Sequence, residues 1–191
     1  MTPPPALDQP QTRQYGATAK SFHWLVVILV AIQFALGWLM PDIKRGMQPE
    51  VLMSLHLSFG FVILLAMLLR GAWRLRTGVP PPEPGLPRWQ VFAADALHLL
   101  LYGLIFLMIF TGWSFASMRG WTILVFGILP VPPIFAQGSA LGNTIGQLHA
   151  TLSWFVLGAI GLHALAGLAH WLFWRDRVMQ RMWPRFKSGA L

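Results

Sequence analysis

The feature that most constrains this chain is an apolar stretch near its C-terminus, residues 147–177, which contains three histidines and ends in a charged Arg-Asp-Arg run. About 20 apolar residues with a rise of roughly 1.5 Å each cross a hydrocarbon core, so the stretch predicts a membrane-spanning helix. His149, His163 and His170 are 14 and 7 residues apart, which places them on one face of that helix. Ionisable residues inside a membrane usually mark functional sites, and imidazole is the commonest metal ligand. Two ligands on one face, about 21 Å apart along the axis, suggest two cofactors stacked across a membrane.

Composition is that of a membrane protein. Of the 191 residues, 55% are hydrophobic and 10% are charged, and the mean hydropathy is +0.58. The net charge of +8 does not indicate nucleic-acid binding, because the Lys and Arg residues flank apolar runs instead of forming a patch. The absence of cysteine excludes disulfides, thiolate-ligated metals, iron–sulfur clusters and covalently attached c-type haem. Any haem must therefore be held non-covalently, by histidine or methionine.

Four long apolar runs predict an all-α fold, an integral membrane four-helix bundle that occupies residues 21–177. The spans are expected at about residues 22–40, 51–69, 91–117 and 147–174. Residues 1–20 are polar and rich in proline, which predicts a flexible tail, and residues 178–191 predict a basic tail.

The connection between the third and fourth spans, residues 118–146, is long and still apolar. Its prolines, Pro130, Pro132 and Pro133, argue against a fifth straight span, because a proline inside a helix removes a hydrogen bond and clashes with the preceding turn. We interpret the segment as a cap at the membrane interface, in which one short helix could form.

The distribution of Lys and Arg orients the spans. Eleven of the fourteen lie on the side that carries both termini and the second loop, and three, Lys44, Arg45 and Arg119, lie on the other side. The cytoplasmic side of a membrane protein carries the excess of Lys and Arg. We therefore expect both termini in the cytoplasm and residues 118–146 outside.

The histidines sort into pairs by depth. His56 and His149 both begin inward-running spans, so they lie near the outer face. His23 begins an outward-running span near the inner face, and His163 lies about 21 Å inward of His149. Each pair joins two different helices, as a ligand site in a bundle core requires, so the pattern predicts two buried haems, each held by two histidines. Spacing alone leaves His170 open as the inner ligand, because it shares a face with His163.

Two other interpretations of the histidines stay open: a histidine-lined path for metal ions or protons, and polar contacts within the bundle. A zinc site normally has three or four ligands at one depth, whereas these histidines come in twos. His98 and Tyr102, four residues apart in the third span, share a face near the inner edge. His98 is either a hydrogen-bonding residue between helices or, with His170, part of a site that holds a quinone headgroup or carries its protons.

An ordered set of short motifs runs through nearly everything after Tyr15. They are Phe22-His23-Trp24-Leu25, His56-Leu57-Ser58-Phe59-Gly60, His98-x-x-x-Tyr102, Arg119-Gly120, Phe126-Gly127, Gln147-Leu148-His149, Gly161-Leu162-His163, Ala169-His170-x-x-Phe173, Arg175-Asp176 and Arg181-Met182-x-Pro184. In this order they resemble the bacterial cytochrome b561 family of small four-helix di-haem membrane cytochromes. Within that family the chain is similar to the superoxide oxidase, or superoxide:ubiquinone oxidoreductase, branch.

The resemblance implies a set of ligands. By it, His23 and His163 are the axial ligands of the inner haem b iron, and His56 and His149 those of the outer one, which decides for His163 over His170. It also implies a quinone site near the inner haem that involves His170, and a multi-pass protein of the bacterial inner (plasma) membrane. Many members have two consecutive histidines where this chain has His170-Trp171, a departure within that quinone site.

The function expected from the resemblance is that of an oxidoreductase. Superoxide is oxidised to oxygen at the outer surface, and its electron passes through the outer and inner haems to ubiquinone. Arg119, helped by Lys44 and Arg45, is expected to attract the superoxide anion, with anchoring at the membrane interface as its alternative role.

Two other functions stay open. One is a cytochrome b subunit that takes electrons from a hydrogenase or dehydrogenase partner, and the other is a non-redox, histidine-lined membrane transporter or scaffold. The partners expected here are membrane lipid, ubiquinone and superoxide, without nucleic acid.

Overall fold

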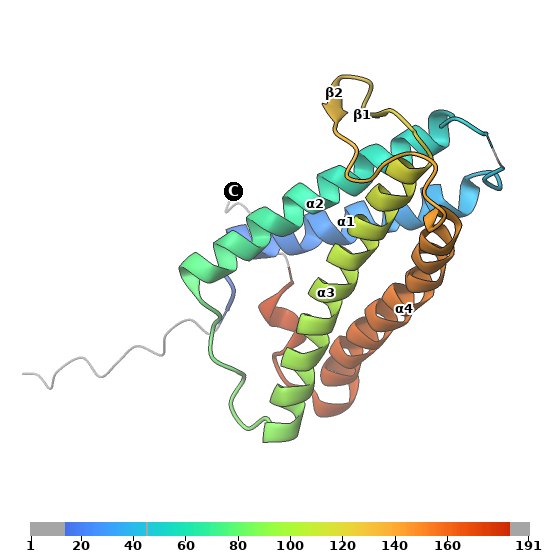
Figure 1. The fold of residues 1–191 in the computed structure, drawn as a ribbon. Coiled ribbons are helices and arrows are strands. Elements are labelled where there is room, and N and C mark those ends of the chain that lie inside the picture. Colours follow the sequence, from blue (N-terminus) through green and yellow to red (C-terminus); the bar gives the residue numbers. More distant parts are fainter. Residues whose placement is uncertain (1–13, 45, 184–191) are drawn as a thin grey trace, which may run out of the picture.

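The computed structural model describes residues 14–44 and 46–183. They form four long helices, a two-stranded hairpin and two short helical turns (Figure 1). The bounds are α1 Ala17–Leu39, α2 Val51–Thr77, α3 Arg88–Met118, β1 Ile123–Val125, β2 Leu129–Val131 and α4 Gly142–Ala169, followed by a π-helix at His170–Trp174 and a 3₁₀ helix at Met179–Arg181. Within these residues, the four long helices are long and apolar enough to cross a membrane. The predicted helical membrane bundle with four spans is confirmed. Most of the expected N-terminal tail, Arg45 and residues 184–191 lie outside the described residues.

The helices extend past the apolar runs that revealed them. α1 begins at Ala17, within the segment expected to be a tail, and α2 continues beyond its arginines to Thr77. Backbone signals end both helices. Pro41 disfavours the helical region at the residue before it, and Met40 is extended. Gly78 caps α2 with φ +72°, a left-handed conformation that glycine adopts without strain.

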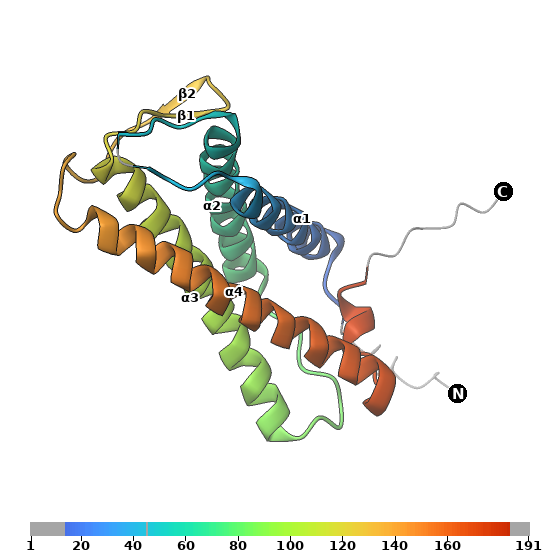
Figure 2. The same ribbon diagram turned by 90° about the vertical axis from the view of Figure 1, so that its right-hand side faces the viewer.

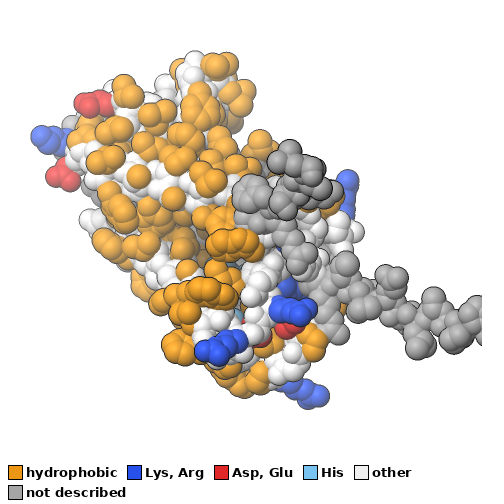
Figure 3. All heavy atoms as spheres, turned by 180° about the vertical axis from the view of Figure 1, so that it is seen from behind, with side chains coloured by type: hydrophobic (Ala, Val, Ile, Leu, Met, Phe, Trp, Pro, Cys, Tyr) orange, Lys and Arg blue, Asp and Glu red, His pale blue; other side chains and the backbone are white. Residues whose placement is uncertain are grey.

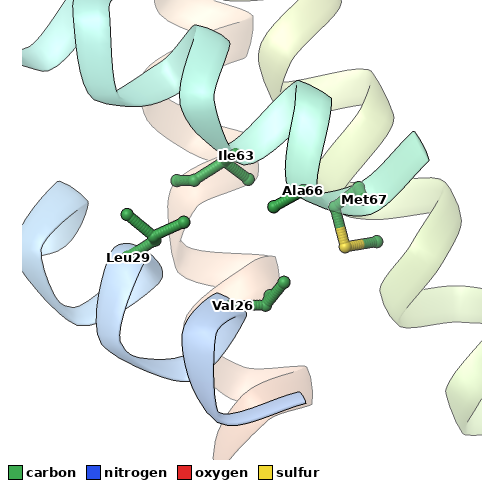
Figure 4. Packing of buried hydrophobic residues seen from close by; sticks show 5 residues of the cluster. All are labelled: Val26, Leu29, Ile63, Ala66 and Met67. Atoms are coloured by element: carbon green, nitrogen blue, oxygen red, sulfur yellow. The ribbon is translucent and has the colours of Figure 1, made fainter. Parts of the chain in front are cut away.

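The bundle consists of two helix pairs, α1 with α2 and α3 with α4, and the pairs meet through contacts between α2 and α3 (Figure 1 and Figure 2). A buried apolar cluster holds the first pair together, in which side chains of α1 pack against side chains of α2 (Figure 4). Its members are Val26, Leu29, Ile63, Ala66 and Met67. The small Ala66 side chain lets the two backbones approach, which is how helices pack where lipid removes the hydrophobic driving force.

The segment between α3 and α4 forms a β-hairpin, with β1 and β2 antiparallel and Leu124 opposite Pro130. The short helix considered for this segment is wrong, because residues 119–141 are all described and contain none. Pro130 lacks an amide hydrogen and is tolerated in a strand that has a free edge. Phe126 and Gly127 turn the chain with positive φ values of +50° and +74°. The Phe126 amide donates to the buried Ser58 hydroxyl of α2 at 2.9 Å, which fixes the turn to the bundle.

The outer surface of the bundle is mostly apolar. Hydrophobic side chains cover much of the face in Figure 3, and charged side chains gather toward its two ends. We call the end with the α1–α2 loop and the β-hairpin the hairpin end (Figure 1). We call the opposite end, with the start of α1, the α2–α3 loop and residues 175–183, the terminal end. An apolar girdle between two polar ends is the surface that a lipid bilayer requires.

Candidate functional site

The structure brings four of the predicted histidines together in two pairs. At the hairpin end, His56 of α2 lies next to His149 of α4, with ring centroids 6.2 Å apart and ring planes at 81°. At the terminal end, His23 of α1 lies next to His163 of α4, also with centroids 6.2 Å apart, and with planes at 67°. The pairs are separated by roughly 21 Å along α4.

The spacing within each pair is that of two imidazoles on opposite sides of one metal. A metal–imidazole bond is about 2 Å and the ring centroid lies about 1 Å beyond the nitrogen, so such rings have centroids about 6 Å apart. Within the described residues, no three His, Asp or Glu side chains form a group that could hold a metal ion. Each pair therefore has the ring spacing of two imidazoles that share one metal ion.

The hydrogen bonds of His149 leave one ring nitrogen available. Its Nδ1 lies 3.0 Å from the Met108 carbonyl oxygen and 3.1 Å from the Thr111 hydroxyl, both on α3. A carbonyl can only accept, so Nδ1 carries the proton and donates, and Nε2 keeps its lone pair. Metal-binding histidines are oriented in this way, by a hydrogen bond from the nitrogen that does not bind the metal.

A cavity of about 320 Å³ lies between the four helices at the hairpin end. Residues of all four long helices line it, among them Gln33, His56, Gly112 and His149. None of the described residues that line the cavity is Lys, Arg, Asp or Glu. Its volume is at the lower end of the range of about 300–1,000 Å³ usual for cofactor sites. The lining suits a flat apolar group.

Two details of this cavity concern the room for the His149 ring and the polar atoms of its wall. A Cβ on Gly112 would lie 2.9 Å from Cε1 of His149, so only glycine leaves room for the ring. Nδ1 of His56 and Oε1 of Gln33 are buried without a hydrogen-bond partner among the described residues. Buried polar atoms nearly always have partners, so these two atoms are available to a group bound in the cavity.

The terminal-end pair has charged and polar neighbours. Arg70 of α2 donates through Nη1 to Nδ1 of His23 at 3.2 Å and through Nε to the Tyr102 hydroxyl at 3.0 Å. His98 of α3 lies next to His163, with ring centroids 5.3 Å apart. The structure thus places His98 beside the terminal-end pair.

His170 lies in the π-helix that ends α4. Its Nδ1 is 2.5 Å from Oδ2 of Asp176, and its ring is 4.7 Å from that of Trp174. The carboxylate in turn accepts the Val178 amide at 3.0 Å. Arg175 makes the turn possible with φ +52°. The result is a His–Asp pair at the terminal end, near the end of a spanning helix.

Arg119 lies at the hairpin end, one residue after α3. Its guanidinium donates to the Lys44 carbonyl oxygen and lies 5.7 Å and 5.8 Å from the ring centroids of Phe115 and Trp121. The structure therefore brings Arg119 and Lys44 together, and Lys44 is exposed. Arg45, the third expected cation, lies outside the described residues.

Sequence reasoning missed three residues that contact the histidine pairs. In the sequence Arg70 counts only as a charge that orients the spans, although it is 14 residues after His56 and so on the same face of its helix. Thr111, and Gln33, which donates to the His56 carbonyl oxygen at 3.0 Å, are not singled out by the sequence pattern. A polar residue inside an apolar run was the available signal for both.

Comparison with known proteins identifies the family. The family profile described as prokaryotic cytochrome b561 matches residues 14–185, most of the chain. The chain belongs to the prokaryotic cytochrome b561 family. It is thus a membrane b-type cytochrome with a role in electron transfer, and a multi-pass protein of the bacterial inner membrane. Membership implies haem b, and the described histidine pairs, the uncharged cavity and its glycine-lined wall fit such a group.

Curated relatives span nearly the whole chain. Cytochrome b561 homolog 2 of Escherichia coli (strain K12) is 32% identical over 180 residues, which are 92% of this chain and 94% of the relative. Probable superoxide oxidase CybB of Yersinia pestis is 32% identical over 176 residues, 91% of this chain and 97% of the relative. Cytochrome b561 homolog 1 of Escherichia coli (strain K12) is 28% identical over 177 residues, 91% of this chain and 99% of the relative.

Proposed function

We propose that this cytochrome carries electrons from superoxide, through two haems b that are each held by two histidines, to ubiquinone. The observation that carries the proposal is the pair of histidine sites, each with ring centroids 6.2 Å apart and each built from two helices. The similarity to a probable superoxide oxidase supports superoxide as the donor. In the proposal the hairpin end faces the periplasm and the terminal end the cytoplasm, because eight of the ten described Lys and Arg residues lie at the terminal end.

The proposed ligands are His56 and His149 at the hairpin end and His23 and His163 at the terminal end. When bound, each haem would accept and donate one electron inside the apolar bundle, where water and free ions are excluded. The protein's part is to hold each ring in place, as Met108 and Thr111 do for His149.

At the hairpin end, we propose that Arg119 and the exposed Lys44 attract the superoxide anion. The interaction of Arg119 with the Lys44 carbonyl and with two aromatic rings keeps its charge in a fixed place at the membrane surface. A fixed positive charge raises the local concentration of an anion and its rate of encounter.

At the terminal end, we propose that His170 and Asp176 serve the quinone. Reduction of a quinone to a quinol takes two electrons and two protons, so two superoxide ions yield two oxygen molecules and one quinol. The 2.5 Å contact between His170 and Asp176 holds a titratable pair at the end of α4, where it can pass protons from the aqueous side. His98, which lies beside His163, is proposed as a further member of this quinone site and not as a haem ligand.

The test is the reduction and reoxidation of the purified cytochrome. Superoxide from an enzymatic generator is expected to reduce its haems, superoxide dismutase to abolish that reduction, and a short-chain ubiquinone to reoxidise them. Haems that dithionite reduces and superoxide does not would contradict the donor and move the function to a cytochrome b subunit fed by a redox protein partner. Reduced haems that ubiquinone leaves unchanged would contradict the acceptor.

A further inference from the structure

The two histidine pairs differ in the charge around them. The described residues that line the hairpin-end cavity include no Lys, Arg, Asp or Glu. At the terminal end, Arg70 contacts His23 of the pair directly. A second cation is close by, since the guanidinium carbon of Arg74 lies 6.0 Å from the ring centroid of Tyr102. At the hairpin end, the Arg119 guanidinium lies over the cavity-lining Phe115 and Trp121 rings, whereas at the terminal end Arg70 contacts a histidine of the pair itself.

Arg70 is held so that its guanidinium points at the terminal-end pair. Its Nε donates to the Tyr102 hydroxyl at 3.0 Å, and its guanidinium carbon lies 5.7 Å from the centre of that ring. Its Nη1 donates to Nδ1 of His23 at 3.2 Å. The side chain is half-buried near the end of the apolar part of α2, where an uncompensated positive charge is costly. Among the described residues, no carboxylate forms an ion pair with Arg70.

The contact with His23 is incompatible with metal binding through Nε2. A guanidinium has only donors, so in this contact Nδ1 accepts and the ring proton is on Nε2. A His23 that binds iron through Nε2 carries its proton on Nδ1, and two donors would then face each other. Arg70 must take another acceptor when the site is filled, and the planar fork of a guanidinium fits a carboxylate best.

Haem b itself brings two such carboxylates, its propionates. We propose that Arg70, positioned by Tyr102, binds a propionate of the terminal-end haem and makes this haem the one with the higher reduction potential. The inference rests on the proposed haem at His23 and His163. Ferrous haem carries one positive charge less than ferric haem, so a nearby guanidinium stabilises the reduced form. At the hairpin end the nearest cation is Arg119, whose guanidinium lies over the Phe115 and Trp121 rings that line the cavity and has no recorded contact with either histidine, so we expect it to raise that potential less. The electron then moves downhill from the hairpin end to the terminal end.

The experiment is a redox titration of the purified full-length cytochrome, with haem counted per chain and each haem followed by its own optical and electron paramagnetic resonance signals. The variants are Arg70→Gln, which removes the charge, Arg70→Lys, which keeps it without the fork, and Tyr102→Phe, which removes the anchor. Arg76→Gln is the matched control, because Arg76 is exposed and on the same helix. The His163→Ala variant, which is expected to keep only the hairpin-end haem, identifies which signal belongs to that haem.

We expect Arg70→Gln to lower the potential of the terminal-end haem by at least a tenfold change in its reduction equilibrium, about 59 mV for one electron. Arg70→Lys and Tyr102→Phe should give smaller shifts in the same direction, and Arg76→Gln none. Selective loss of the terminal-end haem from Arg70→Gln, with Arg70→Lys retaining it, would also support the propionate contact.

Unchanged potentials and haem content in Arg70→Gln, or a wild type whose hairpin-end haem has the higher potential, would overturn this inference and leave the proposed function standing. A wild type with fewer than two haems per chain would remove the proposed function itself, and this inference with it. The two failures are therefore distinguishable in one set of samples.

Discussion

At the scale of single residues, the two nitrogens of His149 have different tasks. Nδ1 donates to a backbone carbonyl of α3, which fixes the orientation of the ring, and Nε2 keeps the lone pair that a metal needs. His23, at the other end of the bundle, has the Arg70 guanidinium in the place of a carbonyl. Two histidines with the same proposed role therefore have different neighbours, one neutral and one cationic.

Replacing His163 by alanine is expected to remove the terminal-end haem and to leave the hairpin-end haem in place, because the ligand pairs share no residue. His98→Ala is the matched control, since its ring lies only 5.3 Å from that of His163 and is not a proposed ligand. Haem per chain, measured by the pyridine haemochrome method, should fall by half in the first variant and stay constant in the second. The opposite pattern would contradict the assignment of His163.

Replacing Arg119 by alanine is expected to slow superoxide-driven haem reduction by roughly threefold at low ionic strength, because one fixed charge contributes part of the attraction. The effect of the substitution on the rate should shrink as salt is added, because at 0.1 M salt the field of a surface charge decays over about 10 Å. Stopped-flow rates at several salt concentrations measure both effects. Arg76→Ala, at the opposite end, should leave the rate unchanged, and equal rates for Arg119→Ala and wild type at every salt concentration would contradict the proposed steering.

At the scale of elements, the close approach of α3 and α4 positions His149. Gly112 on α3 leaves space for the His149 ring, and a Cβ there would lie 2.9 Å from its Cε1. Non-bonded contacts of a Cβ this short essentially never occur in proteins, so the ring or the helix would have to move. The α3–α4 pair is thus part of the hairpin-end site as well as part of the scaffold.

Gly112→Ala is therefore expected to weaken or remove the hairpin-end haem. Gly103→Ala is the control on the same helix, because a Cβ at Gly103 meets nothing within 4 Å and should raise helix stability by up to about 1 kcal/mol. Haem content and thermal unfolding of the two variants give the comparison. Full haem content in Gly112→Ala would show that the His149 ring has room to move and would contradict the proposed need for glycine at this position.

The elements show what the sequence could reveal. The four helices follow from apolar runs long enough to span a bilayer, a signal that one chain carries clearly. The β-hairpin escaped prediction because its residues are apolar on both strands and lack the alternation that marks a strand. Its available signal was Phe126-Gly127 between two short runs rich in Ile, Leu and Val, which is typical of a turn.

The site was predictable where one helix carries the pattern and less so where helices meet. His149 and His163 lie on one face of α4, and depth in the membrane was enough to match them with His56 and His23, which the structure brings within ring contact. Arg70 could not be assigned in this way, because its contacts with His23 and Tyr102 depend on how α1, α2 and α3 pack together. Helix packing is a property of three-dimensional contacts that periodicity does not specify.

At the scale of the whole molecule, charge differs between the two ends of the bundle. Of the Lys and Arg residues that the structure describes, eight lie at the terminal end and two, Lys44 and Arg119, at the hairpin end. This asymmetry predicts that both termini are cytoplasmic. Reporter fusions at Leu191 and within the α1–α2 loop test it: alkaline phosphatase should be active only on the loop and green fluorescent protein only on the terminus. The reverse pattern would invert the membrane orientation and the proposed direction of electron flow.

We propose above all that each histidine pair holds one haem b. The most direct measurement is the haem-to-chain ratio of the purified cytochrome, combined with the electron paramagnetic resonance spectrum of its oxidised form. We expect two haems per chain, both low-spin as bis-histidine ligation requires. A single haem, or a high-spin signal of matching intensity, would contradict it.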